Sequence, residues 1–393
     1  MRVLMPVHSN YEHDIRVQRE AETLAGIGYE VTVLSLWPDH SRTEPYRRNG
    51  VSIIPEVIGF KHGIPRFASM MKRIARFIRQ NREYDIIHAH DLDTAFPAVN
   101  NALPTQTVIY DSHEWYRGNI ALRNKPLKRK IWQNLENRVV KRADRLITVN
   151  ESIATLFRQT YQTIKDDITV VRNFSIPAHR MDADELWIYN ESSSTAQLLR
   201  NLKQNSSYIA FYGGHLTKGR GLPHYLDAVR QSSNVGLVIA GSGKLEKWLK
   251  EKLREESLNQ KAIYAGHLTL PRLYGLMRFC DVGLSYIEPL SESYYYALPN
   301  KLTEYLQNGL PVVASNLPEI KNLVTRYGIG RIAASPKEFY KILTKLDEIV
   351  DNPKIQNNIT QAADKLHWDR EKENLLALYH SIEYKMGPLP HKL

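Results

Sequence analysis

The chain has 393 residues, of which 42% are hydrophobic and 24% charged, and this ordinary globular composition predicts two domains at this length. No apolar run reaches the roughly 18 to 20 residues of a transmembrane helix, and the chain starts directly with a strand-like segment instead of a signal peptide. The single cysteine, Cys280, cannot form an internal disulfide. We therefore expect a soluble, unexported protein of the reducing cytoplasm.

The formal net charge of +11 and the pI near 9.4 predict a polyanionic neighbour, which could be nucleic acid, an anionic lipid surface or a phosphorylated ligand. The basic residues are concentrated in two N-terminal segments, 61–82 and 117–145. Because no aromatic-basic RNA motif, helix-turn-helix or zinc module occurs, we do not expect nucleic acid as a partner.

Short apolar runs rich in β-branched residues alternate with longer helical patterns, which predicts an α/β fold class built from parallel βαβ units. Strands are predicted at 2–6, 30–36, 51–55, 85–89, 107–111, 145–149 and 168–171, and a second series at 208–212, 237–240, 262–265, 282–285 and 311–314. The polar stretch 175–207 is predicted to link two Rossmann-like domains. Ligand sites are then expected at the carboxyl ends of the strands.

Residues 64–82 have apolar positions at three- and four-residue spacing opposite arginines, which predicts an amphipathic helix. Its basic face is either exposed to solvent or binds an anionic lipid leaflet together with a loop at 125–130. In the second case each basic residue near the surface would add roughly 1 kcal/mol to the free energy of membrane binding. The residues expected on such a surface are Arg66, Lys72, Arg73, Arg76, Arg79, Lys128, Arg129 and Lys130.

The segment 291–315 contains the most informative pattern. Pro299 and Asn300 predict the start of a helix capped by Asn300, which ends at Gly309. Glu304 then lies in the first turns, where a carboxylate can accept both hydroxyls of a ribose while backbone N–H groups face a diphosphate. Lys301 adds positive charge. The alternative is an ordinary amphipathic helix with an exposed glutamate.

This segment resembles the donor-binding motif of the family 4 retaining glycosyltransferases, in which two glutamates separated by seven residues precede a G-x-P-V-V-A turn. Glu304 and residues 309–314 match, whereas Tyr296 stands where the first glutamate is expected. The loop 213–221 resembles the G-R-L-x-x-x-K-G loop of the same family, with His215 in the place of the arginine and Arg220 in that of the lysine. His215 serves either as a ligand contact or in loop packing.

Asp111-Ser112-His113-Glu114 resembles the D-x-H-E motif of the family, which implies that His113 lies beside the donor sugar. A lone histidine at a strand end is otherwise more often structural. The resemblance implies catalytic roles for His113, Arg220 and Glu304, donor diphosphate or sugar contacts by Gly214, His215, Lys218, Tyr296, Leu298, Pro299, Asn300 and Lys301, and nucleotide contacts by Gly241, Gly266, His267, Leu268 and Glu304.

The resemblance also implies a GT-B fold, with two Rossmann-like domains facing each other across a cleft. Residues 1–174 would form an acceptor-binding domain, completed by a C-terminal helix at about 369–393, and residues 208–368 a donor-binding domain. The implied reaction moves a sugar from a UDP- or GDP-sugar to a glycan or lipid-linked acceptor with retention, in the synthesis of a cell-surface polysaccharide or glycolipid.

Asp91-Leu92-Asp93 mimics the metal-binding Asp-x-Asp of the other large glycosyltransferase fold, but cationic side chains and a helix start already provide charge for the diphosphate. We therefore expect no metal and no cofactor besides the nucleotide sugar. The alternatives are a catalytically silent sugar-nucleotide-binding protein, which the substitutions at Tyr296 and His215 favour, and a GT-B nucleotide-sugar epimerase.

Overall fold

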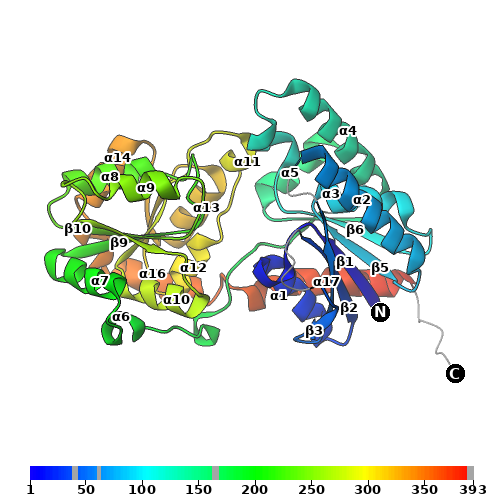
Figure 1. The fold of residues 1–393 in the computed structure, drawn as a ribbon, viewed down its shortest axis with the longest axis horizontal. Helices are drawn as coiled ribbons and strands as arrows, with labels where there is room; N and C mark the ends of the chain where they lie inside the picture. The colour runs from blue at the N-terminus through cyan, green and yellow to red at the C-terminus, as the bar shows by residue number, and fades with distance from the viewer. Residues whose placement is uncertain (38–42, 60–62, 162–167, 387–393) are drawn as a thin grey trace. The chain divides into compact units, whose positions relative to one another are not determined.

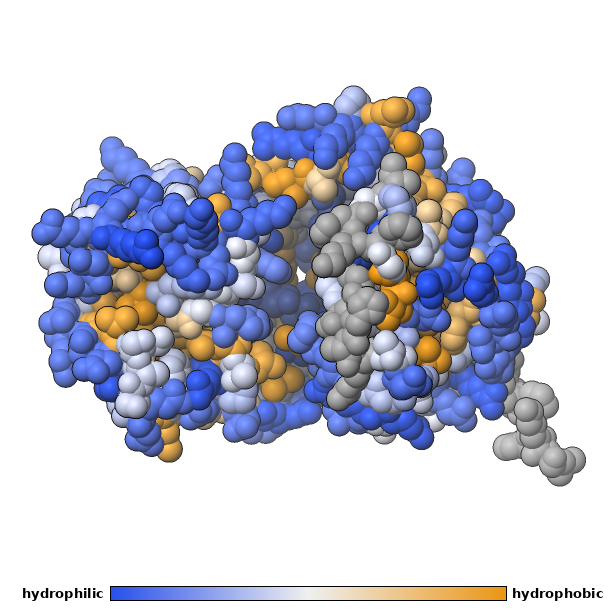
Figure 2. Space-filling model, in the orientation of Figure 1, coloured by the Kyte–Doolittle hydropathy of each residue, from blue (hydrophilic) through white to orange (hydrophobic). Residues whose placement is uncertain are grey.

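The computed structural model describes residues 1–37, 43–59, 63–161 and 168–386. Contacts divide the chain into two compact units, Met1–Asn173 with Glu371–Leu393, and Phe174–Arg370. Within the described residues no helix combines the length and apolarity needed to cross a bilayer. Hydrophilic side chains cover much of the face drawn in Figure 2, with apolar side chains in smaller separate areas.

The first unit is built on an eight-stranded sheet with the order β3-β4-β2-β1-β5-β6-β7-β8. Only β3 pairs antiparallel, with β4, and the other strands are parallel. The strands are β1 (Arg2–Val7), β2 (Glu30–Trp37), β3 (Tyr46–Arg48), β4 (Val51–Val57), β5 (Ile86–His90), β6 (Thr107–Ser112), β7 (Arg145–Thr148) and β8 (Thr169–Val170).

Helices cover both faces of this sheet (Figure 1). They are α1 (Ile15–Gly26), α2 (Gly63–Gln80), α3 (Leu92–Asn101), α4 (Pro126–Arg142), α5 (Glu151–Thr160) and α17 (Trp368–Met386), with 3-10 turns η1 (Tyr11–His13), η2 (Tyr116–Gly118) and η3 (Ile120–Leu122). Helix α17 begins in the second unit, and from Glu371 onward its residues belong to the first. Residues 387–393, expected in the same helix, lie outside the described residues.

The second unit has a six-stranded sheet, β11-β10-β9-β12-β13-β14, in which every pair is parallel. The strands are β9 (Tyr208–Gly213), β10 (Val235–Ala240), β11 (Ala262–Gly266), β12 (Val282–Ser285), β13 (Val312–Ser315) and β14 (Gly330–Ala333). Because all strands run the same way, the loops that follow them gather at one edge.

The helical elements of the second unit also lie on both faces of its sheet (Figure 1). They are η4 (Ala178–Arg180), α6 (Trp187–Asn190), α7 (Ser194–Asn205), α8 (Leu222–Gln231), α9 (Glu246–Lys252), α10 (Leu270–Phe279), α11 (Glu292–Tyr295), α12 (Lys301–Gln307), α13 (Pro318–Tyr327), α14 (Pro336–Leu343), α15 (Asp347–Val350) and α16 (Pro353–Ala363).

The stretch 175–207 differs from the linker that its polar sequence predicts. Ser193 caps α7 by accepting a hydrogen bond from the backbone N–H of Ala196, and Ala196, Leu199 and Leu202 are buried in the core of the second unit. Three apolar residues at helical spacing are enough to attach a short helix whose other positions are mostly polar. This stretch therefore belongs to the second unit.

Every predicted strand is present, but the sequence did not reveal β3 and β14. Both lie at sheet edges and are short, and β3 consists of Tyr46, Arg47 and Arg48, which show no apolar alternation. Edge strands with charged residues carry little periodic signal because only one side of the strand is paired.

Helix α2 confirms the predicted amphipathic segment, since Met70, Ile74 and Ile78 form its buried face. Two of its arginines also make contacts within the first unit. Arg66 donates to the backbone oxygen of His8 at 3.0 Å, and Arg73 pairs with Glu56.

Candidate functional site

Three glycine-containing loops are joined at the carboxyl edge of the second sheet. The backbone N–H of Gly214, after β9, donates to Ala240 O at 3.0 Å, and that of Gly241, after β10, donates to Gly266 O at 2.8 Å. A Cβ atom on Gly241 would lie 2.0 Å from the oxygen of Gly214, so only glycine permits this approach. The predicted nucleotide loops thus form one continuous backbone surface.

Helix α12 is fixed against this edge by a buried aromatic side chain. The backbone N–H of Gly213 donates to the hydroxyl of Tyr305 at 3.2 Å, and that hydroxyl donates to Leu284 O at 3.2 Å. The ring leaves no room beside β12, because a Cβ atom on Gly283 would lie 2.3 Å from it. Tyr305 therefore sets the position of Lys301 and Glu304 on the same helix.

Lys301 is directed toward the first glycine loop. Its Nζ lies 3.8 Å from the ring centroid of Tyr212, whose hydroxyl donates to His215 O at 2.8 Å, and 3.2 Å from where a Cβ of Gly214 would be. Burial lowers the pKa of Lys301 well below its usual range, and Arg220 acts in the same direction against Glu304. An anion bound beside this amine would oppose both effects and favour its charged form.

Arg220 is held by stacking while part of its guanidinium has no partner. Its Cζ lies 4.6 Å from the ring centroid of Tyr294, and its Nε is buried without a hydrogen-bond partner among the described residues. Gly221 adopts φ +78°, and a Cβ there would lie 2.6 Å from Tyr286 O. This turn orients a side chain suited to grip two phosphate oxygens.

The start of α12 differs from the prediction. Asn300 has helical backbone angles, φ −54° and ψ −34°, and its side chain makes no capping hydrogen bond, so the predicted cap is wrong. The N–H groups of Leu302 and Thr303 donate to Pro299 O at 3.1 Å and Asn300 O at 3.0 Å. These two N–H groups are therefore already used within the first turn and are not free for a ligand.

The other predicted donor residues lie around the same edge. Tyr296 follows α11, its ring centroid 4.9 Å from that of Tyr295, whereas Gly309, with φ +79°, follows α12 and precedes β13, so it lies at the opposite, amino edge of the sheet. The other predicted donor and nucleotide positions are exposed or half-buried: Gly214, His215, Lys218, Gly241, Gly266, His267, Leu268, Leu298, Pro299 and Glu304.

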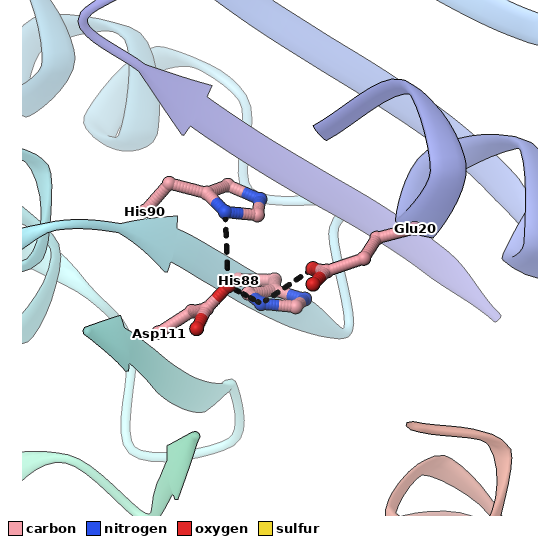
Figure 3. Close-up of side chains that lie close together, drawn as sticks. All are labelled: Glu20, His88, His90 and Asp111. Atoms are coloured by element: carbon pink, nitrogen blue, oxygen red, sulfur yellow. Dashed lines mark ion pairs between the residues drawn. The ribbon is translucent and has the colours of Figure 1, made fainter. Parts of the chain in front are cut away.

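The first unit contains a buried polar network of six side chains: Arg16, Glu20, His88, His90, Asp111 and His113. Figure 3 shows four of them, with Glu20 on α1, the two histidines on β5 and Asp111 on β6. Arg16 donates to both oxygens of Asp111, at 3.0 and 2.8 Å, and to Val171 O at 2.8 Å. Burial favours the neutral acid, but Arg16 and His113 hold the pKa of Asp111 well below its usual range.

His113 is held by a carboxylate at each ring nitrogen. Nε2 lies 3.2 Å from Asp111 Oδ2 and Nδ1 lies 3.4 Å from Asp91 Oδ2, while the backbone N–H donates to Asp91 Oδ1 at 3.1 Å. Burial opposes the charge, but the two carboxylates raise the pKa of His113 to about 9. The side chain is therefore a fixed imidazolium at neutral pH and not a free base.

The two histidines of β5 stay neutral. Burial lowers the pKa of His90 to about 3, and His88, stacked on it with ring centroids 4.5 Å apart, acts in the same direction. His88 Nδ1 lies 2.9 Å from the hydroxyl of Tyr379, which ties α17 to the network. Sequence reasoning assigned no role to Arg16 or Glu20.

The sequence shows no metal-ligand spacing, yet the fold brings ligand atoms of Glu20, His88, His90 and Asp111 within 4.8 Å of one another. The guanidinium of Arg16 already contacts both oxygens of Asp111 and lies 3.0 Å from Glu20 Oε1. A divalent cation would have to share this carboxylate with an arginine, which Coulomb repulsion disfavours. These contacts are those of an ion-pair network.

The Asp91-Leu92-Asp93 segment has internal partners too. His8 Nδ1 lies 3.2 Å from Asp93 Oδ1, and this carboxylate raises the pKa of His8 to about 10 against the effect of burial. Asp91 faces His113, as above, from a backbone with φ +67°. Both carboxylates thus each hold a histidine.

The basic segment 125–130 was predicted as a loop but forms the first turn of α4, which Pro126 starts. Lys128, Arg129 and Lys130 are exposed there, beside Leu127 and Ile131, whose exposed fractions are 75% and 52%. Such an exposed apolar pair inside a basic turn is typical of an interfacial surface.

Comparison with known proteins finds a glycosyltransferase family model in each of the two units. Residues 15–175 match the family model described as Glycosyltransferase Family 4, and residues 195–366 match the model described as Glycosyl transferases group 1. An uncharacterized glycosyltransferase of Methanocaldococcus jannaschii is 22% identical over 385 residues, which cover 93% of each chain.

Solved structures share the fold. Sucrose-phosphate synthase from Thermosynechococcus elongatus aligns with a TM-score of 0.77 at 14% identity, covering 97% of this chain and 99% of that one. HepE of Anabaena, in complex with UDP-glucose, aligns with a TM-score of 0.70 at 16% identity, covering 97% and 100%. These likenesses show a GT-B fold.

Proposed function

The chain belongs to the family 4 glycosyltransferases of the GT-B fold, and we propose that it moves a sugar from a nucleotide diphosphate sugar to a glycan or lipid-linked acceptor with retention of configuration. One observation carries the donor part of the proposal. Lys301 Nζ lies beside the loop at Gly214, and Arg220 has a buried Nε without a hydrogen-bond partner among the described residues, so a diphosphate bound there would gain two cationic partners.

In this proposal the diphosphate contacts Arg220, Lys301 and the backbone at Gly214, and Glu304 accepts hydrogen bonds from the ribose hydroxyls. Gly241, Gly266, His267 and Leu268 border the base. A UDP-sugar is a reasonable donor class because HepE, which shares the fold, is solved with UDP-glucose. A GDP-sugar fits the same contacts.

The leaving nucleotide diphosphate would itself assist the deprotonation of the acceptor, on the face from which it departs. Arg220 and Lys301 would stabilise the charge that develops on it, and His113 would supply a fixed positive charge in the first unit. We propose that no metal takes part, since these groups already supply positive charge. Activity should then persist in the presence of a chelator.

The experiment measures release of UDP from UDP-glucose and other donors, with and without acceptor, in wild type, Glu304→Ala and Arg220→Ala. We expect release that both variants lose and that EDTA leaves unchanged. Lys321→Ala, an exposed change on α13, serves as the control. Loss of activity on chelation, or full activity in Arg220→Ala, contradicts the proposal.

A silent sugar-nucleotide-binding protein is the second candidate, because Tyr296 replaces the first motif glutamate and His215 the motif arginine. The same assay separates the two candidates. Nucleotide binding without release from any donor, with or without acceptor extract, would favour the silent binder. Donor turnover to an epimer without acceptor would indicate an epimerase.

We further propose that the enzyme works in the cytoplasm at the membrane surface, with the first turn of α4 against anionic lipid. Co-sedimentation with phosphatidylglycerol vesicles at low salt should decrease when Lys128, Arg129 and Lys130 are all changed to Gln. The free energy of membrane binding should weaken by roughly 1 kcal/mol for each charge removed. Leu127→Ser should weaken it further. Equal binding to neutral phosphatidylcholine vesicles would contradict this assignment.

A further inference from the structure

A cavity of about 350 Å³ lies at the carboxyl ends of strands in the first unit, apart from the buried polar network. Its lining includes Asn10, Glu12, Trp37, Tyr46, Pro55 and Glu56. They come from the segment after β1 and from β2, β3 and β4. The volume is within the range of small-molecule sites, roughly 300 to 1,000 Å³.

An aromatic ring is fixed at this cavity. Trp37 ends β2 and is 38% exposed, although large aromatic side chains are usually covered. The guanidinium carbon of Arg66 lies 5.0 Å from its ring centroid, and Arg66 is itself held by its hydrogen bond to His8 O. The indole is thus positioned while part of its surface stays available to a ligand with an apolar face.

Two carboxylates at the cavity are charge-balanced but keep accepting capacity. Glu12 accepts a hydrogen bond from the hydroxyl of Tyr46 at 2.7 Å and pairs with Arg48, and Glu56 pairs with Arg73. Their side chains remain 28% and 33% exposed. Each carboxylate has about four lone-pair sites, so both can still accept hydrogen bonds from hydroxyl groups.

The charge of this cavity differs from that of the donor edge. Arg48 and Arg73 are each paired with one of the two carboxylates, and Arg66 is directed to His8 O and to the Trp37 ring, so a phosphate here would lie beside the carboxylates Glu12 and Glu56. A neutral molecule rich in hydroxyls avoids that repulsion and uses the carboxylates as acceptors. Ring and carboxylates together therefore favour an uncharged sugar.

The loop that lines the cavity also reaches His113. The hydroxyl of Ser35 donates to Ser9 O at 2.9 Å and accepts from the N–H of Tyr11 at 3.2 Å, which fixes the loop after β1. The same loop carries His8, whose ring lies 4.0 Å from Asp91, the partner of His113. Cavity and imidazolium are thus joined through one short segment.

We propose that this cavity binds a neutral sugar unit of the acceptor, with Trp37 against its C–H face and Glu12 and Glu56 accepting from its hydroxyls. The assignment of this sugar to the acceptor rests on the proposed glycosyl transfer. The binding of the sugar does not.

Saturation-transfer NMR tests the binding on the whole protein, with methyl glycosides of glucose, galactose, mannose and N-acetylglucosamine as probes and glucose 6-phosphate as the charged counterpart. We expect transfer to at least one neutral glycoside and weaker transfer to the phosphate. Trp37→Ala should weaken binding by about tenfold, whereas Trp37→Phe keeps most of it. Tyr384→Ala, which removes an aromatic ring 90% exposed on α17, is the matched control and should bind as wild type does.

Glu56→Gln keeps the shape of the side chain and provides a second variant in case Trp37→Ala does not fold. It should weaken the same glycoside. No transfer to any neutral glycoside, equal transfer in wild type and in both variants, or a preference for glucose 6-phosphate would each overturn the proposal.

UDP binding, followed by thermal shift in the same samples, separates this proposal from the proposed function. Bound UDP with no bound glycoside refutes the cavity alone. Glycoside binding that depends on Trp37, without binding of any nucleotide, refutes the donor site and leaves the cavity as a sugar site.

Discussion

The charged side chains at the buried polar network of the first unit and at the predicted donor edge of the second unit differ in whether they have a partner of opposite charge. In the first, Arg16 and Asp111 are buried and His113 is half-buried, and each of these charges has a partner of opposite sign within 3.2 Å. In the second, Arg220 stacks on the ring of Tyr294, and its buried Nε has no hydrogen-bond partner among the described residues. Lys301 lies against the ring of Tyr212.

This difference indicates which charges belong to the fold and which await a ligand. A buried charge that loses its partner is costly, so changes within the buried polar network should reduce stability. A cation without an internal partner contributes little to folding, so its removal should reduce ligand binding and catalysis instead. Each prediction below tests one side of this contrast.

The largest effect is expected for Arg16→Met, which leaves Asp111 and Glu20 buried without their guanidinium. The free energy of unfolding should fall by about 3 to 5 kcal/mol, as measured by urea denaturation. Arg2→Gln breaks the exposed pair with Glu30 and should cost less than about 1 kcal/mol. Similar losses in the two variants would show that the buried polar network contributes no more to the free energy of unfolding than an exposed ion pair does.

Arg220→Ala should leave unfolding nearly unchanged while kcat for donor turnover falls by about 10² to 10³, or roughly 3 to 4 kcal/mol. The reason is that a preorganised donor to the departing diphosphate is lost. Steady-state kinetics and urea denaturation of the same preparation check both halves. A stability loss as large as that of Arg16→Met would remove the distinction between the units.

The pH dependence of stability should reveal His113. Its folded pKa of about 9 exceeds the value near 6.5 of an unfolded histidine, so its contribution is complete below about pH 6.5 and is lost as pH rises to about 9. We expect the loss to reach at most about 3 kcal/mol. Urea denaturation of wild type and His113→Gln across this window checks it, because the variant should show the flatter profile. A steeper profile in the variant would refute the assigned charge.

UDP at 100 times its dissociation constant should stabilise the protein by about 2.7 kcal/mol. The shift should vanish in Arg220→Ala, shrink in Lys301→Met and persist with EDTA, as followed by differential scanning fluorimetry. His90→Gln lies in the other unit and should retain the shift if it folds. A shift that Arg220→Ala keeps would move the nucleotide away from this edge.

The sequence by itself determined the α/β class, the strand series and the glycine loops, because apolar periodicity and glycine positions are local signals. It also determined the family, through Glu304 with the turn after it. The prediction of a linker at 175–207 was wrong because a few apolar side chains of this polar stretch are buried in the core of the second unit. The prediction of a cap at Asn300 was wrong because this residue has helical backbone angles and makes no capping hydrogen bond.

Only the tertiary structure decided which charged residues meet. Arg16 and Asp111 are 95 positions apart, and His88 and Tyr379 are 291 apart, so no spacing along the chain could predict either contact. The protonation of His113, and the Arg220 nitrogen that has no hydrogen-bond partner among the described residues, follow from such long-range neighbours. Charge states depend on what surrounds a group in space, and that is fixed only when distant strands and helices come together.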